Sequence, residues 1–376
     1  MSHNPGNSAV RVSVQPESSE STEDLNVRNG PAIHTPDYLV VVPITKTLLD
    51  SYTGVNIRRF LQTAVALAAE NDGRVLLLGF EPVTSDTTLE TVRERVQAEG
   101  PNDTGRPDTI EAIKERRAQL AEVVDVAQEL SPAPPITASL QVVRDVTSGI
   151  LAAADRDGET AVLLLRGVGL EGDRLFDRST VDAVLDNAQC DVFVENTGTE
   201  GGEFPLYVLN TEDHAVTPLV DSEARPVDSI LLPVSAGPHA ALAAEAARAV
   251  ARADDALVTI LHVISSDEAR ADGEDILKFA DYVLGPNVET TTKIQTADTA
   301  VEAIADEATE HDFVSIGAPE QKSQLEQFVF GSLEETLSEQ IEATILMARD
   351  ADATMRSLYY RWKQGIESTD DNETSE

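Results

Sequence analysis

The stretch that decides the fold is Tyr38–Pro43, which reads YLVVVP. A short continuous apolar run of this kind is typical of a strand buried on both faces of a parallel sheet. From Phe60 onward, apolar residues recur at i, i+4 and i+7 and predict a helix that ends near Gly73. A second apolar run, Arg74–Phe80 (RVLLLGF), predicts the next strand. Strand, helix and strand in this order indicate a βαβ unit and a parallel sheet with helices on its faces.

The same alternation continues and then occurs a second time. Further strands are expected at 136–142, 160–165 and 190–194, and then at 229–233, 256–263, 288–294, 313–316 and 344–348. Further helices are expected at 109–130, 147–154 and from 179, and then at 239–252, 275–284, 299–311 and 332–342, with an inserted loop and one short helix within 81–108. A pattern that occurs twice indicates an internal duplication. The sequence therefore predicts an α/β protein of two Rossmann-like domains, each with a mostly parallel five-stranded sheet and flanking helices.

Composition suggests where these domains begin and end. The predicted boundaries are a disordered tail at 1–35, a first domain at 36–196, a linker at 197–227, a second domain at 228–350 and a C-terminal segment at 351–376. The tail has no hydrophobic period, and the linker is rich in Gly and Pro. The C-terminal segment is first basic and aromatic and then acidic.

The charge balance is strongly acidic. The chain has 67 acidic and 28 basic residues, for a formal net charge of −39, and only six of the basic residues are Lys. Such a chain repels itself in dilute buffer, whereas at molar salt the Debye length falls to about 3 Å and screens the repulsion. We therefore expect a cytoplasmic protein of an extreme halophile. The acidic excess also opposes non-specific nucleic-acid binding, which depends on neutralising phosphates.

Several kinds of chemistry are not expected from the sequence. The single cysteine, Cys190, excludes an internal disulfide framework and a cysteine metal cluster. No His or Asp spacing typical of a metal site occurs, and no run of 18 apolar residues or signal-peptide pattern is present. A nucleophile elbow with a Ser-His-Asp arrangement and a complete Walker loop are also missing. We therefore expect no metal, no catalytic residues and no enzyme activity.

Four segments resemble strands of the universal stress protein (UspA) family. Val40–Thr45 (VVVPIT) and Ile230–Ser235 (ILLPVS) are similar to the family's first strand, and Leu261–Val263 (LHV) is similar to the end of its second strand. Cys190–Val194 (CDVFV) resembles the family's last strand. The resemblance covers roughly 38–195 and 228–349 and implies a tandem form with two adenine nucleotide alpha hydrolase-like domains.

The resemblance also implies a nucleotide site in each copy. In the family, a G-x2-G-x9-G-[ST] loop after the fourth strand holds the phosphates of ATP, and an Asp after the first strand contacts the adenosine. Glycines let the backbone approach phosphate, and the following helix N-terminus adds partial positive charge. The positions of this chain that correspond to the site or lie beside it are Thr45, Gly169, Gly172, Ser179, Thr180, Ser235, Gly317, Gly331 and Ser332.

Both copies depart from the family pattern. The family's first Gly corresponds to Arg166 in the first copy and to Ala318 in the second. The adenosine-contacting Asp is replaced by Thr45 and Ser235. Two interpretations stay open: the loops bind ATP or AMP, or they are only connections between strand and helix.

Three functions follow from these observations. The leading hypothesis is a non-catalytic stress-response or regulatory protein with degenerate adenine-nucleotide binding. An alternative is a soluble accessory or regulatory subunit of a membrane transporter that docks through Tyr359, Tyr360 and Trp362, in a basic and aromatic segment of an acidic chain. A third is a weak ATP hydrolase.

The resemblance further implies how the two copies meet. Members of the family often dimerise through the last strand, so 190–194 and 344–348 are expected to pair antiparallel inside one chain. Such a monomer would be a pseudo-dimer, and a homodimer is the alternative. Ligands of open α/β sheets bind beyond the carboxyl ends of the strands. Two crevices are therefore expected, lined by residues 44–46, 166–180, 234–239 and 317–332.

Overall fold

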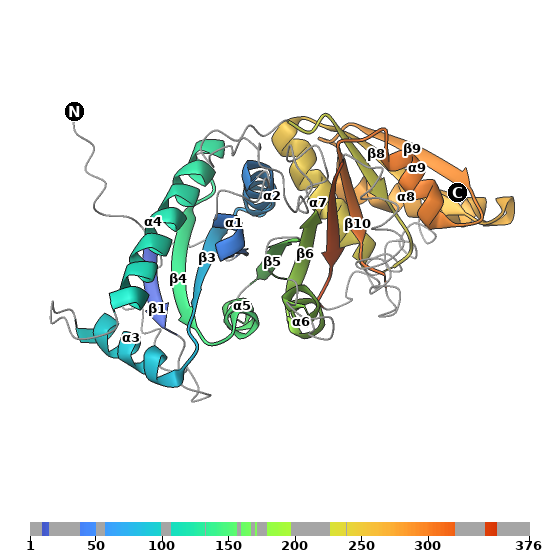
Figure 1. Ribbon diagram of the computed structural model, residues 1–376. Helices are drawn as coiled ribbons and strands as arrows, with labels where there is room; N and C mark the ends of the chain where they lie inside the picture. Colours follow the sequence, from blue (N-terminus) through green and yellow to red (C-terminus); the bar gives the residue numbers. More distant parts are fainter. Residues whose placement is uncertain are drawn as a thin grey trace, which may run out of the picture.

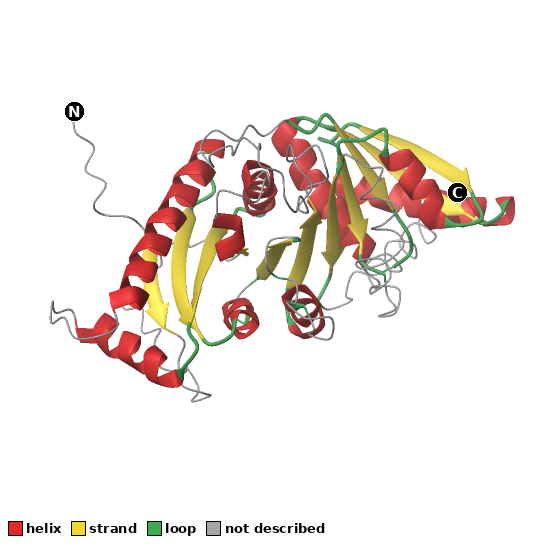
Figure 2. Ribbon diagram, viewed as in Figure 1, coloured by secondary structure: helices red, strands yellow, loops and turns green. Residues whose placement is uncertain are grey.

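The computed structural model describes residues 10–14, 38–49, 57–98, 107–131, 133–155, 159–166, 170, 179–196, 226–237, 239–319 and 343–351 of the 376-residue chain. These residues form one 11-stranded sheet with helices on both of its faces (Figures 1 and 2). We refer to residues 10–196 as the first half of the chain and to residues 226–351 as the second half.

The first half contains six strands and six helices among its described residues. The strands are β1 (Val10–Val14), β2 (Leu39–Ile44), β3 (Arg74–Pro82), β4 (Ile136–Val143), β5 (Thr160–Leu165) and β6 (Asp191–Asn196). The helices are α1 (Lys46–Leu49), α2 (Ile57–Glu70), α3 (Asp86–Ala98), α4 (Pro107–Leu130), α5 (Val146–Ala154) and α6 (Thr180–Asn187).

The described residues of the second half contain five strands. These are β7 (Ser229–Pro233), β8 (Leu257–Ile264), β9 (Thr290–Thr296), β10 (Phe313–Gly317) and β11 (Thr344–Arg349). The helices are α7 (His239–Asp254), the 3-10 turn η2 (Asp267–Ala269), α8 (Arg270–Leu284) and α9 (Ala300–Ala308).

The strand order repeats across the sheet. The full order is β1-β4-β3-β2-β5-β6-β11-β10-β7-β8-β9, so β4-β3-β2-β5-β6 in the first half corresponds to β9-β8-β7-β10-β11 in the second. All strand pairs within a half are parallel. Each half thus has the doubly wound order of a Rossmann-like fold, and the predicted fold class is confirmed.

The two halves join through an antiparallel pair of strands at the centre of the sheet. Strand β6 pairs antiparallel with β11, and Phe193 lies opposite Ala348 while Glu195 lies opposite Leu346. The predicted pairing of the two last strands inside one chain is therefore confirmed.

The strand register shows which residues of the two halves correspond. Val40 in β2 and Ile230 in β7 stand at the same place in corresponding strands, one residue after the strand begins. From Val40 and from Ile230, the paired residues can be followed across the parallel strands of each half, to β6 and to β11. The positions reached in this way show that Glu195 of β6 corresponds to Ala348 of β11. A carboxylate in one half thus replaces a methyl group in the other.

Alternating aliphatic residues fill the space on both sides of the sheet. One face packs against α2, α4, α7 and α8, with Phe60, Leu120 and Leu284 fully buried. The opposite face packs against α5, α6 and α9, with Ile150 and Val184 fully buried (Figure 1). Strands whose two faces are both covered read as continuous apolar runs, which is why the sequence predicted them.

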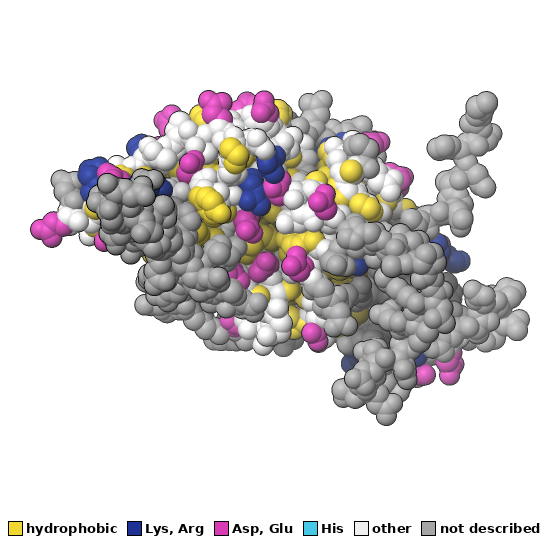
Figure 3. Space-filling view, turned by 180° about the vertical axis from the view of Figure 1, so that it is seen from behind, with side chains coloured by type: hydrophobic (Ala, Val, Ile, Leu, Met, Phe, Trp, Pro, Cys, Tyr) yellow, Lys and Arg dark blue, Asp and Glu magenta, His cyan; other side chains and the backbone are white. Residues whose placement is uncertain are grey.

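Acidic side chains are spread over the described part of the face seen in Figure 3. In Figure 3, magenta side chains are scattered across the described part of the back face among white and hydrophobic areas, with few Lys or Arg. This distribution agrees with the formal net charge of −39.

Some predicted elements differ from the structure. The disordered tail predicted for 1–35 is wrong for Val10–Val14, because this segment forms β1 and pairs in parallel with β4. The short helix predicted within 81–108 is α3, which has 13 residues. Helix α1 was not predicted. The predicted helix at 332–342 lies outside the described residues, as do nearly all of the predicted linker and C-terminal segment.

Candidate functional site

Thr45 follows β2 at the carboxyl edge of the first half. Its hydroxyl oxygen accepts a hydrogen bond from the amide of Leu48 at 3.1 Å, and its carbonyl accepts one from the amide of Leu49 at 3.2 Å. The residue is buried, with 7% of its surface exposed. Thr45 therefore caps the short helix α1, which is the ordinary role of a threonine at this place.

Ser179 and Thr180 begin helix α6, as predicted. The hydroxyl of Ser179 accepts a hydrogen bond from the Asp182 amide at 3.1 Å and donates one to the Asp182 carboxylate at 2.7 Å. The amide of Thr180 donates to the carbonyl of Leu170 at 2.8 Å, and its hydroxyl lies 2.9 Å from that of Thr147. These groups, which a phosphate would use, already have partners within the chain. Asp182 also places a negative charge in the first turn, where it opposes a bound anion.

The topology brings the ends of β2 and β5 to the same edge of the sheet. These strands are parallel neighbours, so Thr45 and Arg166 both follow them at the carboxyl edge. The amide of Arg166 donates to the carbonyl of Glu195 at 2.9 Å, which fixes the start of the loop after β5. Gly169 and Gly172 lie outside the described residues.

Ser235 and Gly317 occupy the corresponding edge of the second half. Ser235 is exposed, and its hydroxyl accepts a hydrogen bond from the Gly237 amide at 3.3 Å. Gly317 ends β10 against the first turn of α7, where an added Cβ would lie 2.8 Å from the carbonyl carbon of His239 and 3.0 Å from the Ala240 nitrogen. The structure thus explains Gly317 by close packing of helix on strand. Gly331 and Ser332 lie outside the described residues.

Two histidines near this edge have main-chain partners. The Nδ1 atom of His239 accepts a hydrogen bond from the amide of Asp350 at 3.0 Å. The Nδ1 atom of His262 lies 2.8 Å from the carbonyl oxygen of Val234. Both rings therefore have structural roles.

Within the part of the chain that the structure describes, no cluster of three or more His, Cys, Asp or Glu side chains could hold a metal ion. None of the helices in that part is long and apolar enough to cross a membrane.

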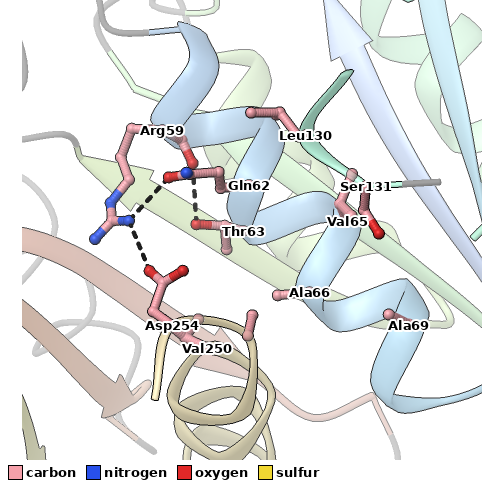
Figure 4. A pocket seen from close by; sticks show the side chains of 11 residues that line it. Arg59, Gln62, Thr63, Val65, Ala66, Ala69, Leu130, Ser131, Val250 and Asp254 are labelled. Carbon is pink, nitrogen blue, oxygen red and sulfur yellow. Dashed lines mark hydrogen bonds and ion pairs between the residues drawn. The ribbon is translucent and has the colours of Figure 1, made fainter. Parts of the chain in front are cut away.

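A polar cluster that the sequence did not predict lies where the two halves meet. A cleft of about 230 Å³ is lined by Arg59, Gln62, Thr63, Val65, Ala66, Ala69, Leu130, Ser131, Val250, Ala253 and Asp254 (Figure 4). Figure 4 shows Arg59 of α2 pointing toward Asp254 at the end of α7. The guanidinium lies 3.3 Å from the Asp254 carboxylate and 3.0 Å from the Gln62 side-chain oxygen. It also lies 5.7 Å from the centre of the Phe313 ring.

Glu195 lies close to this cluster and is completely buried. Within the described part of the chain, neither of its carboxylate oxygens has a hydrogen-bond partner. Burial raises the pKa of Glu195 to about 7, although the Thr63 hydroxyl and the Arg59 guanidinium are near enough to lower it. The Thr63 hydroxyl is itself directed to the carbonyl of Arg59, at 3.5 Å. The sequence contained one signal, a charged residue directly after the buried run Val192–Val194.

The chain matches no protein-family model and no curated protein. Among solved structures, it is similar to a universal stress protein from Archaeoglobus fulgidus DSM 4304, with 16% identity and a TM-score of 0.49 over 84% of this chain and 97% of that one. It is also similar to the cytoplasmic domain of a prokaryotic cation chloride cotransporter, with 12% identity and a TM-score of 0.47 over 86% and 99% of the two chains. A universal stress protein in complex with cAMP matches 33% of this chain and 97% of its own, with 16% identity and a TM-score of 0.26. These are likenesses of fold, and they include universal stress proteins that match across both halves.

Proposed function

We propose that this chain is a non-catalytic regulatory protein of the stress-protein type that binds an adenine nucleotide weakly at the carboxyl edge of its first half. The observation that carries the proposal is the placement of Thr45, Arg166 and the α6 N-terminus after parallel strands of one doubly wound sheet. Ligands of such sheets bind beyond the carboxyl ends of the strands.

The contacts at α6 favour a ligand with little negative charge. The Ser179 hydroxyl and the Thr180 amide are already hydrogen-bonded within the chain, and the Asp182 carboxylate lies in the first turn. Each added phosphate charge would be repelled by that carboxylate. We therefore expect AMP to bind more tightly than ATP.

Nucleotide titration by calorimetry in molar KCl, with and without Mg²⁺, tests this function. Asp182→Asn removes one negative charge from the helix start and is expected to raise the affinity for ATP by about two- to fivefold, since such a charge contributes about 0.3–1 kcal/mol there. Asp186→Asn, in the last turn of the same helix, is the matched control and should leave the affinity unchanged. If neither the parent protein nor Asp182→Asn gives heat with millimolar AMP, ADP or ATP, the chain is no nucleotide sensor. Turnover of ATP would contradict the proposal that the protein is non-catalytic.

A second candidate function rests on the C-terminal sequence. Residues 355–365 (MRSLYYRWKQG) carry three basic and three aromatic residues and no acidic residue, in a chain with a net charge of −39. Basic and aromatic side chains favour membrane interfaces and partner surfaces. An accessory subunit of a membrane transporter would co-fractionate with membranes and lose this behaviour when 355–366 is deleted. A nucleotide sensor without such a partner would show neither result.

A further inference from the structure

Glu195 is placed where the two halves of the sheet are hydrogen-bonded to each other. It lies between Leu165 of β5 and Leu346 of β11, and all three residues lie on the sheet face that packs against α2 and α7. The corresponding residue of the second half is Ala348. The fold therefore accepts an apolar side chain at this position, and the carboxylate of Glu195 is not needed to build the sheet.

The charged group that faces Glu195 is Arg59 of α2, and it is shared with the second half. Arg59 pairs with Asp254 of α7 and stacks over Phe313 of β10. Asp254 also accepts a hydrogen bond from the Val227 amide, just before β7, at 3.0 Å. One guanidinium thus connects α2 to α7 and β10 of the second half and, through Asp254, to the residues just before β7.

Among the described residues, the charges of Arg59, Asp254 and Glu195 balance when Glu195 is neutral. Arg59 and Asp254 cancel each other, and their side chains are 8% and 15% exposed. Ionised Glu195 would add a second carboxylate to a single guanidinium, and a buried charge without a partner is costly. The two carboxylates would then compete for Arg59.

We propose that protonation of Glu195 controls the contact between the two halves of the chain. With Glu195 neutral, Arg59 holds Asp254 and Phe313 as the structure has them. Ionisation of Glu195 draws Arg59 toward β6 and weakens its bonds to the end of α7 and to β10. The joint between the halves therefore loosens as pH rises.

The direction of the effect follows from linkage. Burial raises the pKa of Glu195 from an ordinary 4.5 to about 7, so the folded state holds a proton that the unfolded state releases. The stabilisation that protonated Glu195 contributes to the folded state is fully present below pH 4.5, and it decreases as pH rises toward and through 7. Molar salt screens the exposed carboxylates but screens a buried one far less. The transition should therefore persist in molar KCl.

The experiment follows the thermal midpoint and hydrogen exchange of the full chain in 3 M KCl from pH 5 to 8.5. We expect the midpoint to fall by about 3–6 °C across this range. After correction for intrinsic rates, exchange should accelerate at the β11 amides that pair with β6 and less at β2 and β3. Glu195→Gln, a neutral isostere, should abolish the acceleration at β11 and reduce the fall of the midpoint, to which Glu81 and Glu245 also contribute because burial raises the pKa of each.

Two further variants separate the proposal from a general effect of burial. Asp254→Asn removes a competing carboxylate and should move the transition to lower pH, because ionised Glu195 then no longer competes with Asp254 for Arg59. Glu81→Gln is the matched control, since burial also raises the pKa of Glu81, which lies near Arg116 within the first half. It should leave the β11 transition in place. An unchanged transition in Glu195→Gln, or no shift in Asp254→Asn, would overturn the proposal.

Discussion

The Arg59 guanidinium lies 3.3 Å from the Asp254 carboxylate, and this ion pair joins α2 of the first half to α7 of the second. Helix α2 is the long helix after β2, and α7 is the long helix after β7, the corresponding strand of the second half. A second contact of the same kind is made by Glu70 of α2, which binds Arg248 at 2.7 Å and Arg252 at 2.8 Å. Charge pairs therefore hold these two helices together on one face of the sheet.

Arg59→Ala should destabilise the protein by about 3 kcal/mol, because it leaves a mostly buried carboxylate without its cation. Urea unfolding in molar KCl measures the change. Arg58→Ala on the same helix is the control, since Arg58 pairs with Glu129, whose side chain is 63% exposed, and it should cost less than about 1 kcal/mol. Equal losses of unfolding free energy in the two variants would show that the Arg59–Asp254 pair contributes no more than the exposed Arg58–Glu129 pair.

Gly317→Ala should destabilise the second half by about 1–3 kcal/mol, since the new methyl group would meet the main chain of α7 rather than a side chain that can move. Thermal unfolding measures the loss. Gly285→Ala introduces no contact within 4 Å, but φ +74° and ψ 171° lie in a region that essentially only glycine adopts, so it should cost about 1–3 kcal/mol through backbone strain alone. A Gly317→Ala variant with unchanged thermal stability would contradict the close packing of β10 on α7.

Cys190 should resist alkylation in the folded protein. Burial is the main cause that raises the pKa of its thiol from 9.0 to about 11, which lowers the thiolate fraction about 100-fold. Iodoacetamide labelling should therefore require unfolding. In the control, Cys190→Ser combined with Gln189→Cys moves the thiol to the adjacent exposed position, where labelling should be rapid. Rapid labelling of Cys190 in the native state would contradict its burial.

The sequence was a good guide to the strands that are buried on both faces. Runs such as Val40–Pro43 and Thr160–Leu165 are apolar because helices cover both sides of the sheet, and no other part of the chain is needed to recognise them. Strand β1 was missed because its five residues lie within a polar segment. Its pairing comes from the outer edge of β4, which sequence periodicity cannot reveal.

The candidate site was less predictable for a related reason. The sequence placed Ser179 correctly at a helix start, yet it could not show that Asp182 uses the same hydroxyl. Arg59, Glu195 and Asp254 are far apart in the chain, and nothing in the sequence shows that they meet. Only the antiparallel joint between β6 and β11 brings them together.

The position of β11 has a consequence for synthesis of the protein on the ribosome. This strand is the last one of the described chain, yet it lies in the middle of the sheet, between β6 and β10. Residues 197–343 must therefore be translated while β6 has no neighbour on one side. An unpaired strand edge can pair with another chain, and partly folded multidomain chains aggregate in this way. Nascent chains of this protein consequently need protection of the β6 edge until their final strand has left the exit tunnel.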